Sequence, residues 1–300
     1  ISLQLKAVAL RWNPYHYIYQ MPKNIESITN KILEIKLLSG LYLVATPIGN
    51  LSDITIRAIE VLKSCDVIFC ENPLHSQKLL KHYQISKKLQ KYNDHSGEYD
   101  RNKILNELNH NKSVALISDA GTPCISDPGH KLVKYLKQYN HNIFVIAGAS
   151  SVTTALLSSN MPSNIFTFCG FLPKISSQIE KTLVNFKTYH STLIFFITAK
   201  QLHKIAALVR KIYPNQEIAI CKELTKLHEK SISINSNDLN DDLIENINAK
   251  GEFVILINNQ LKSDKSLAPF AQTLKMILAE NISIKTAVKL TQEITQAKKS

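Results

Sequence analysis

The most restrictive feature of this sequence is a regular alternation of short apolar runs with amphipathic stretches, which begins near residue 40. Residues 41–45 have the length and apolar character of a buried strand, and Asp53 can cap a following helix that continues to Ser64. The pattern repeats, and it predicts strands at 67–71, 114–119 and 143–147 and helices at 75–83, 99–110, 130–139 and 151–159. Strands that alternate with helices at this spacing indicate a mainly parallel α/β sheet over residues 40–161.

The alternation continues past residue 161, and it predicts a second α/β domain over residues 162–260 with its clearest helix at 200–212. The strands expected in this domain are 166–171, 193–198, 217–224, 229–235 and 253–258. Residues 261–300 have the pattern of two amphipathic, lysine-rich helices, which we interpret as a small basic helical appendix. Residues 1–39 form an N-terminal extension, and whether residues 1–20 are native to the protein stays open.

The charge balance points to a polyanionic partner. The chain has 36 lysine and arginine residues against 24 aspartate and glutamate residues, a formal net charge of +12. Such an excess fits RNA, DNA or an anionic membrane surface, although a basic but unspecialised surface would look the same.

The five cysteines are scattered, with no Cys-x-x-C pair and no histidine at metal-ligand spacing, so we expect neither a disulfide framework nor a metal site. No apolar run approaches the roughly 18 residues of a membrane-spanning helix, and the N-terminus lacks the pattern of a signal peptide. We therefore expect a cytoplasmic, soluble protein with no membrane partner.

Three unusual loops follow strands of the first domain, at 46–53, 119–129 and 147–151. Ligands of open α/β sheets bind beyond the carboxyl ends of the strands, where these loops should meet. Loop 46–53 has too few glycines for a dinucleotide fingerprint and lacks the Lys-Ser/Thr of a P-loop. Loop 119–129 holds two carboxylates, two prolines and two glycines, which suits a rigid wall against ribose hydroxyls or a cationic ligand. A tight turn with Asp127 as the N-cap of the next helix is the alternative interpretation.

Several segments in order along residues 40–300 carry a resemblance to a known family. They are Leu-Val-Ala-Thr-Pro-Ile-Gly-Asn-Leu at 43–51 with Asp-Ile-Thr at 53–55, the loop 118–129, Gly-Phe-Leu-Pro-Lys at 170–174, Glu-Leu-Thr-Lys-Leu-His-Glu at 223–229 and Lys-Gly-Glu-Phe-Val at 250–254. The chain resembles the tetrapyrrole methylase family of S-adenosylmethionine-dependent enzymes, and within it the branch that methylates small-subunit (16S) ribosomal RNA.

This resemblance implies two α/β domains with S-adenosylmethionine in the cleft between them, and a homodimer. It also implies 2′-O-methylation of a cytidine ribose in the RNA of the assembled small ribosomal subunit. Carried over position by position, the residues expected to line the cofactor pocket are Pro47, Gly49, Asp119, Gly121, Thr122, Ser126, Asp127 and Gly148.

Methylation of a ribose hydroxyl needs the hydroxyl to be positioned and its proton to be accepted. Glu71, His75 and Lys226 have suitable chemistry and are the candidate catalytic residues, whereas Lys174, His228 and Glu229 are the candidate RNA contacts. A lysine ammonium is a good phosphate contact and a poor base at neutral pH, which favours the RNA-contact role for Lys174. Plainer interpretations stay open: a solvent-facing His75, and a surface ion pair between Lys226 and Glu229.

The chain departs from the family's pattern at 72–74 and at 197–201, where polar groups of the ribosomal branch are replaced, and at 95–98, where a His-Asn-Glu motif is lengthened by one residue. The departures at 72–74 and 197–201 motivate one alternative, a ribosome-binding protein that keeps the cofactor pocket but transfers no methyl group. A methyltransferase of corrin or porphyrin intermediates is the other alternative, and segments 170–174 and 223–229 argue against it.

Overall fold

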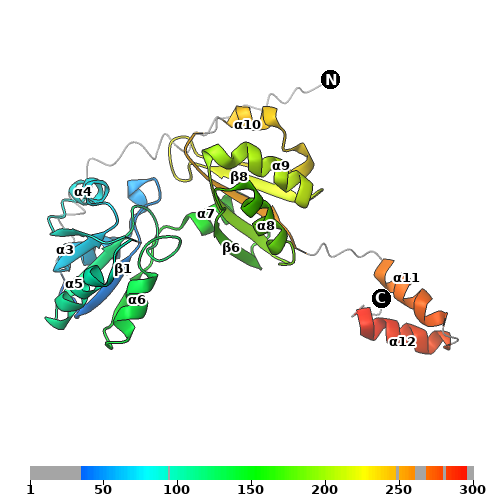
Figure 1. The fold of residues 1–300 in the computed structure, drawn as a ribbon, viewed down its shortest axis with the longest axis horizontal. Coiled ribbons are helices and arrows are strands. Elements are labelled where there is room, and N and C mark those ends of the chain that lie inside the picture. Colours follow the sequence, from blue (N-terminus) through cyan, green and yellow to red (C-terminus); the bar gives the residue numbers. More distant parts are fainter. Residues whose placement is uncertain (1–34, 94, 248–249, 261–267, 280–281, 296–300) are drawn as a thin grey trace, which may run out of the picture.

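The computed structural model describes residues 35–93, 95–247, 250–260, 268–279 and 282–295. They form two α/β domains that lie next to each other and a C-terminal helical hairpin that stands apart from both (Figure 1). The predicted fold class, two α/β domains with a helical appendix, is confirmed.

The first domain is built on a five-stranded sheet in the order β3-β2-β4-β1-β5, and every pair is parallel, as predicted. Its strands are β1 (Gly40–Val44), β2 (Val67–Cys70), β3 (Leu89–Lys91), β4 (Ser113–Ile117) and β5 (Ile143–Ile146). Its helices are α3 (Ile56–Ser64), α4 (Pro73–His82), α5 (Glu98–Asn109), α6 (His130–Lys137) and α7 (Ser151–Ser158). The short edge strand β3 was not expected, because its three residues are too few to show a period.

The expected cap of the first helix was wrong. Asp53 belongs to a short 3₁₀ turn (Leu51–Asp53), and α3 begins only at Ile56. Its N-cap is Thr55, whose hydroxyl oxygen accepts a hydrogen bond from the backbone N–H of Ala58 at 3.1 Å. Thr is nearly as good an N-cap as Asp, so the sequence held two candidates two residues apart.

The second domain has a mixed sheet in the order β6-β7-β10-β8-β9, in which only the β6–β7 pair is parallel. Its strands are β6 (Phe166–Phe171), β7 (Thr192–Thr198), β8 (Glu217–Lys222), β9 (Lys230–Asn235) and β10 (Glu252–Asn258). Its helices are α8 (Ser176–Phe186), α9 (Leu202–Ile212) and α10 (Asp241–Ile247), with 3₁₀ turns at Ala199–Gln201 and Ser236–Asp238. Helices α8 and α10 were not predicted, although α8 buries Ile179 and Leu183 at helical spacing.

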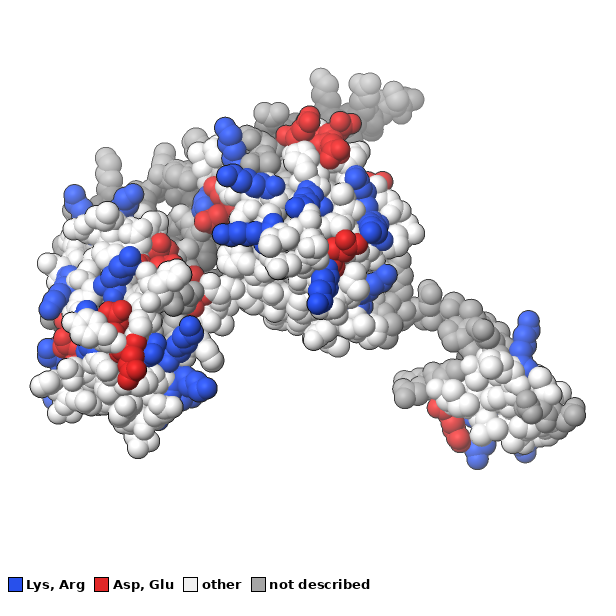
Figure 2. All heavy atoms as spheres, in the orientation of Figure 1, with Lys and Arg blue, Asp and Glu red and all other residues white. Residues whose placement is uncertain are grey.

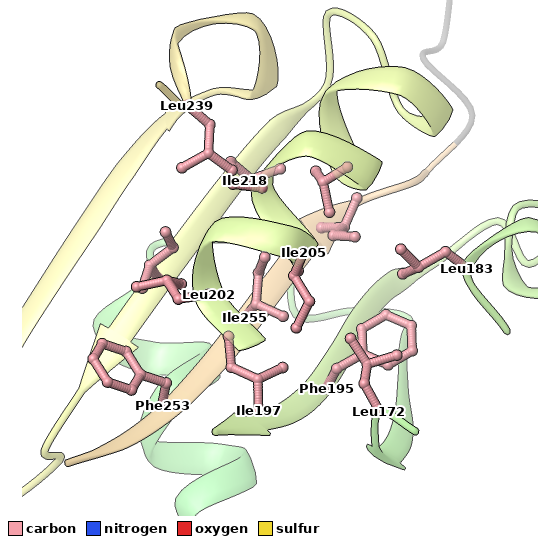
Figure 3. Close-up of a cluster of buried hydrophobic side chains, with 14 of the residues drawn as sticks. Leu172, Leu183, Phe195, Ile197, Leu202, Ile205, Ile218, Leu239, Phe253 and Ile255 are labelled. Carbon is pink, nitrogen blue, oxygen red and sulfur yellow. The ribbon is translucent and has the colours of Figure 1, made fainter. Parts of the chain in front are cut away.

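Helices α8 and α9 cover one face of this sheet, and their apolar side chains form its main core. Figure 3 shows the cluster, in which Ile205 of α9 lies next to Ile255 of the central strand β10. Tyr213 is also buried here, and its hydroxyl donates a hydrogen bond to the carbonyl of Leu183 at 2.7 Å, so its polar atom is satisfied.

Helix α7 covers the opposite face of the second sheet, although it follows the last strand of the first domain. Val152, Ala155 and Leu156 of α7 belong to one buried cluster with Leu256 of β10 and Cys221 of β8. The α7 helix therefore buries its apolar side against the second domain and fixes the two sheets relative to each other.

The C-terminal helices α11 (Ala268–Leu278) and α12 (Ile284–Thr295) pack against each other as a hairpin, which confirms two helices in this region. Ala287 and Thr291 of α12 are buried, and the Thr291 hydroxyl donates to the carbonyl of Ala287 at 2.7 Å. The expected start of the appendix at residue 261 lies outside the described residues.

The described cysteines are all unpaired, and Cys65, Cys70 and Cys221 are buried as small apolar side chains. Within the described ranges, no three His, Cys, Asp or Glu side chains are grouped to hold a metal ion. A search of the same residues found no helix long and apolar enough to cross a membrane.

The central strand β10 should dominate the stability of the second domain. Ile255→Ala deletes a side chain that is 0% exposed, and we expect a loss of about 2–5 kcal/mol in the free energy of unfolding. The measurement is urea denaturation followed by circular dichroism. Leu74→Ala, at a position 76% exposed, is the control and should change it by less than about 0.5 kcal/mol. Equal losses of unfolding free energy in the two variants would contradict a dominant contribution of β10 to stability.

Candidate functional site

A cleft of about 380 Å³ lies between the two domains. The first domain contributes its polar side, made by loop 119–127 and the start of α7, with Ile48 from the first loop. The second domain contributes a mainly apolar side, which consists of Phe171, Phe196, Ile197, Thr198, Leu224, Gly251, Glu252, Phe253 and Val254. A concave site with a few convergent polar groups at a domain boundary is typical of a small-molecule site.

Loop 119–129 is held against the first loop by the backbone. The N–H of Thr46 donates to the carbonyl of Gly121 at 2.8 Å, and the N–H of Gly121 donates back to Thr46 at 3.1 Å. Two non-glycine residues of this loop, Cys124 and Ser126, have φ of +72° and +58°. Such strained conformations persist only where the surroundings enforce them, and they gather at functional sites.

Two carboxylates, Asp119 and Asp127, line the polar side of the cleft. The Asp119 carboxylate accepts a hydrogen bond from the backbone N–H of Asn72 at 3.2 Å, which ties this wall to the loop after β2. Helix α6 begins at His130, and its N-cap Gly129 has no side-chain cap. The alternative interpretation of Asp127 as the N-cap of this helix was therefore wrong, and its carboxylate lines the cleft instead.

The third loop completes this wall. Ser150 and Ser151 line the cleft at the beginning of α7, and the Thr122 hydroxyl donates to the carbonyl of Ala149 at 3.3 Å. Gly148 permits this loop to pack closely against the first loop, because a Cβ at Gly148 would lie 2.8 Å from the Cβ of Ala45, the residue that follows β1.

On the second domain, a lysine joins two glutamates beside the cleft. The Nζ of Lys226 lies 3.0 Å from a carboxylate oxygen of Glu223 and 3.1 Å from one of Glu252. The Glu223 carboxylate also accepts from the backbone N–H of Glu252 at 2.9 Å. Glu223 and Thr225 have φ of +49° and +65°, so this loop is strained as well.

This strained loop contacts the first domain at Gly49. A Cβ at Gly49 would lie 2.5 Å from Cγ of Lys226 and 2.8 Å from the carbonyl of Leu224, so only glycine fits without movement. The next backbone N–H, that of Asn50, donates to the Thr225 hydroxyl at 3.1 Å. The loop at 48–53 and the loop at 223–229 therefore join the two domains at one end of the cleft.

The ion pairs shift the pKa values of both partners. Burial alone would lower the pKa of Lys226, but hydrogen bonds and charge attraction from Glu223 and Glu252 outweigh it and raise that pKa. Burial alone would raise the pKa of Glu223, but the N–H of Glu252 and the Lys226 ammonium hold it below its ordinary value. Both groups therefore stay charged at neutral pH.

The structure brings together many of the predicted cofactor residues. Asp119, Gly121, Thr122, Ser126 and Asp127 line the cleft, whereas Pro47, Gly49 and Gly148 lie in the adjoining loops and do not line it.

The predicted catalytic and RNA-contact residues lie around the cleft, not in its lining. Glu71 and the exposed His75 flank Asn72 after β2. Lys174 and His228 are exposed on the second domain. The Glu229 carboxylate accepts from the backbone N–H of Thr225 at 2.9 Å, and Lys226 forms ion pairs with Glu223 and Glu252. These predicted roles stay predictions.

The sequence interpretation missed Ile48, Thr198, Glu252 and Phe171 as lining residues. Glu252 and Phe171 lie in the segments 250–254 and 170–174, so a signal was present in their motifs. Thr198 lies in the segment 197–201, which the sequence marked only as a departure from the family's pattern, because the sequence does not show that the end of β7 faces the other domain.

A two-domain α/β protein with an acidic-walled cleft between its domains is the class that the fold and the site define. The family model of the tetrapyrrole (corrin/porphyrin) methylases matches residues 40–240. The chain belongs to this family.

Curated relatives and solved structures agree with this assignment. Ribosomal RNA small subunit methyltransferase I of Rickettsia prowazekii (strain Madrid E) is 42% identical over 84% of this chain and 90% of the relative. The protein of that name from Haemophilus influenzae is 35% identical over 87% of this chain and 93% of the relative. The structure of a cobalt precorrin-4 methyltransferase matches with a TM-score of 0.56 and 18% identity, covering 72% of this chain and 93% of that one, which shows the shared fold.

The cofactor of this methylase family is S-adenosylmethionine, and the cleft suits it. Carboxylates such as Asp119 and Asp127 can accept hydrogen bonds from ribose hydroxyls and favour a cationic sulfonium. The apolar opposite side can pack against an adenine ring. The donor set of the cleft therefore agrees with the prediction of this cofactor.

The domain contact predicts a specific effect of Gly49→Ala. The added Cβ must displace Lys226 or the Leu224 carbonyl, and we expect about 1–3 kcal/mol of lost stability together with weaker binding of S-adenosylhomocysteine. Calorimetric titration measures the binding. Gly97→Ala is the matched control, since its Cβ would meet no atom within 4 Å, and it should bind the nucleoside as the wild type does. Unchanged binding of S-adenosylhomocysteine in both variants would show that the contact at Gly49 does not affect the cleft.

The Glu223 carboxylate should make the fold sensitive to acid. Its pKa is lowered below 4.5, so the unfolded chain binds more protons, and the stabilisation is lost as pH falls through the lowered pKa. We expect the melting temperature of the wild type to fall more steeply between about pH 5 and about pH 3 than that of Glu223→Gln, which cannot titrate there. Parallel profiles would show that this ion pair does not stabilise the fold.

Proposed function

We propose that the chain transfers a methyl group from S-adenosylmethionine to the 2′-oxygen of a cytidine ribose in small-subunit ribosomal RNA, and that it acts on the assembled subunit. The observation that carries this proposal is the similarity to small-subunit rRNA methyltransferases over most of the chain, with the acidic-walled cleft intact. The cytoplasmic location expected from the sequence fits such a substrate.

The cofactor would supply an electrophilic methyl group on a sulfonium. The chain's own residues would hold the nucleoside through Asp119 and Asp127 and exclude water with the apolar wall. The proton of the ribose hydroxyl needs an acceptor near the mouth of the cleft. Glu71 and His75 are our candidates, since the hydrogen bond from Asn72 to Asp119 places their loop next to the acidic wall.

Lys226 was also a candidate acceptor, but its surroundings favour a positioning role. Its raised pKa keeps the amine protonated, and a protonated amine cannot accept the proton. Its two ion pairs instead join Glu223 to Glu252, which lines the cleft, and its stem packs against Gly49. We therefore propose that Lys226 sets the geometry of the cleft through the domain contact.

The RNA would lie over a surface rich in lysine. Figure 2 shows lysine and arginine side chains spread over the visible face of both α/β domains, in keeping with the net charge of +12. Lys174 is exposed three residues after the cleft residue Phe171 and suits a phosphate contact. His228 is exposed and Glu229 partly buried, both beside the domain contact, and they are the further candidates for RNA contacts.

A homodimer is also part of this proposal. Val145 on the edge strand β5, Leu157 on α7 and Ile165 before the edge strand β6 are large apolar side chains exposed to solvent. Exposed apolar side chains on edge strands are typical of surfaces that another chain covers. Light scattering during gel filtration measures the mass, and a monomer at micromolar concentration would contradict the dimer.

The direct test is transfer of labelled methyl groups to purified small subunits that lack the modification, with naked RNA as the control. We expect incorporation at one cytidine 2′-oxygen, on the subunit and not on the naked RNA. Binding of S-adenosylhomocysteine without any transfer would instead support the non-catalytic ribosome-binding alternative. Transfer to a corrin or porphyrin intermediate would support the other alternative.

The C-terminal hairpin predicts a separable role in substrate binding. Figure 1 shows it apart from both α/β domains, which supply all the residues that line the cleft, so removal of residues 262–300 should leave the affinity for S-adenosylhomocysteine unchanged. Its lysines should add to electrostatic attraction for RNA, and we expect the truncated chain to bind small subunits at least about tenfold more weakly at low salt. Subunit pelleting and calorimetry measure the two affinities. Equal losses of subunit affinity and S-adenosylhomocysteine affinity would show that the hairpin is needed for the stability of the fold.

A further inference from the structure

The most exposed aromatic side chain of the cleft is Phe171, at the end of β6. Its ring lines the cleft and yet is 60% exposed. Single exposed apolar side chains are common on protein surfaces, but an aromatic ring that also lines a cleft is in a position to contact a ligand.

The backbone turns Phe171 toward the cleft. Between Phe168 and Phe171 the register of β6 shifts against β7, and Gly170 adopts a φ of +74°. A bulge of this kind adds a residue to one strand and changes the direction of the following side chain. Gly170 lies close to the acidic loop of the first domain, because a Cβ there would be 3.8 Å from the Ser126 hydroxyl.

The ring of Phe171 is supported from one side. It meets Phe196 edge to face, with ring centroids 5.2 Å apart and planes at 69°, and Phe196 in turn packs on Phe168 at 4.8 Å. An aromatic ring that is supported by another ring and is 60% exposed can offer a face for stacking.

The segment after Phe171 is fixed by Gln201, which is almost fully buried. Its Oε1 accepts from the backbone N–H of Thr198 at 3.0 Å and from the Thr198 hydroxyl at 2.9 Å. Its Nε2 donates to the carbonyl of Pro173 at 2.7 Å and more weakly to that of Leu172 at 3.4 Å. One side chain thus joins the cleft residue Thr198 to the segment that carries Phe171.

We propose that Phe171 is the platform on which the nucleobase of the acceptor nucleotide stacks, and that Gln201 is the positioning residue that holds this platform at the mouth of the cleft. Single-stranded or extruded bases are recognised by stacking on aromatic side chains, with lysines close by on the phosphates. Lys174, three residues further on and exposed, fits that second contact. The proposal rests on the proposed function and adds the residue that receives the base.

The test compares substitutions that separate a ring face from apolar bulk. Phe171→Tyr keeps the face, whereas Phe171→Leu keeps apolar volume and loses the face. We expect Phe171→Leu to raise the KM for small subunits by about tenfold, which is in the lower part of the range expected for the loss of one stacked base. The Phe171→Tyr variant should have the KM of the wild type. The affinity for S-adenosylhomocysteine and the molecular mass should be those of the wild type. Phe166→Leu, at an exposed ring of the same strand that does not line the cleft, is the control and should behave as the wild type.

Gln201→Glu tests the positioning role, because the carboxylate can still accept from Thr198 but cannot donate to Leu172 and Pro173. The released segment should be cut by trypsin after Lys174 several times faster than in the wild type. The KM for subunits should rise with kcat and nucleoside affinity little changed. Unchanged tryptic cleavage would overturn the role of Gln201.

Three outcomes would overturn the platform. A Phe171→Leu variant as active as the wild type would show that only apolar bulk matters. Loss of S-adenosylhomocysteine affinity would assign the ring to the cofactor, and loss of the dimer would assign it to a second copy of the chain. The wild type itself separates the two proposals. If it binds subunits without methylating them, the proposed methyl transfer is contradicted, and the binding affinity of the Phe171 variants still tests the stacking platform. If it neither methylates nor binds subunits, both the proposed function and the stacking platform are contradicted.

Discussion

The contact between Gly49 and the loop that carries Lys226 is the constraint on which the cleft depends. Only a glycine lets the first loop approach Lys226 and the carbonyl of Leu224, and Lys226 is itself held by Glu223 and Glu252. Because Glu252 and Leu224 also line the cleft, the width of the site is linked to the way in which the two domains meet. Helix α7 provides the second connection, through its apolar packing against β8 and β10.

The two walls of the cleft differ in chemical character. The first domain supplies carboxylates and hydroxyls on a loop that includes the strained residues Cys124 and Ser126, and the second domain supplies aromatic and aliphatic surface. Strain of this kind costs of order 1–3 kcal/mol per residue, so it persists only where the surrounding structure compensates for it. In the proposed function, S-adenosylmethionine would bind in the cleft and RNA would bind to the lysine-rich surface beside it, and the two binding surfaces would meet at Phe171.

The sequence predicts those parts of the molecule that depend on short-range patterns, such as hydrophobic periodicity and loop composition. Buried parallel strands and the loops at their carboxyl ends follow from period and composition, and the structure places Asp119, Gly121, Thr122, Ser126 and Asp127 of the second loop in the cleft lining. The cap of α3 was misplaced because Asp53 and Thr55 are both good caps. The ion pair of Lys226 with Glu252 joins two segments of the second domain that lie 26 residues apart in the sequence, so it depends on tertiary folding. The place of Thr198 in the cleft lining depends on how the two domains meet.

The cleft between the two domains, with its acidic wall, should bind the methyl-donor nucleoside. A crystal structure of the chain with S-adenosylhomocysteine would test this directly. We expect the nucleoside in the cleft, with its ribose hydroxyls within hydrogen-bond distance of the Asp119 or Asp127 carboxylate. A nucleoside bound away from both carboxylates, or on one domain alone, would contradict it.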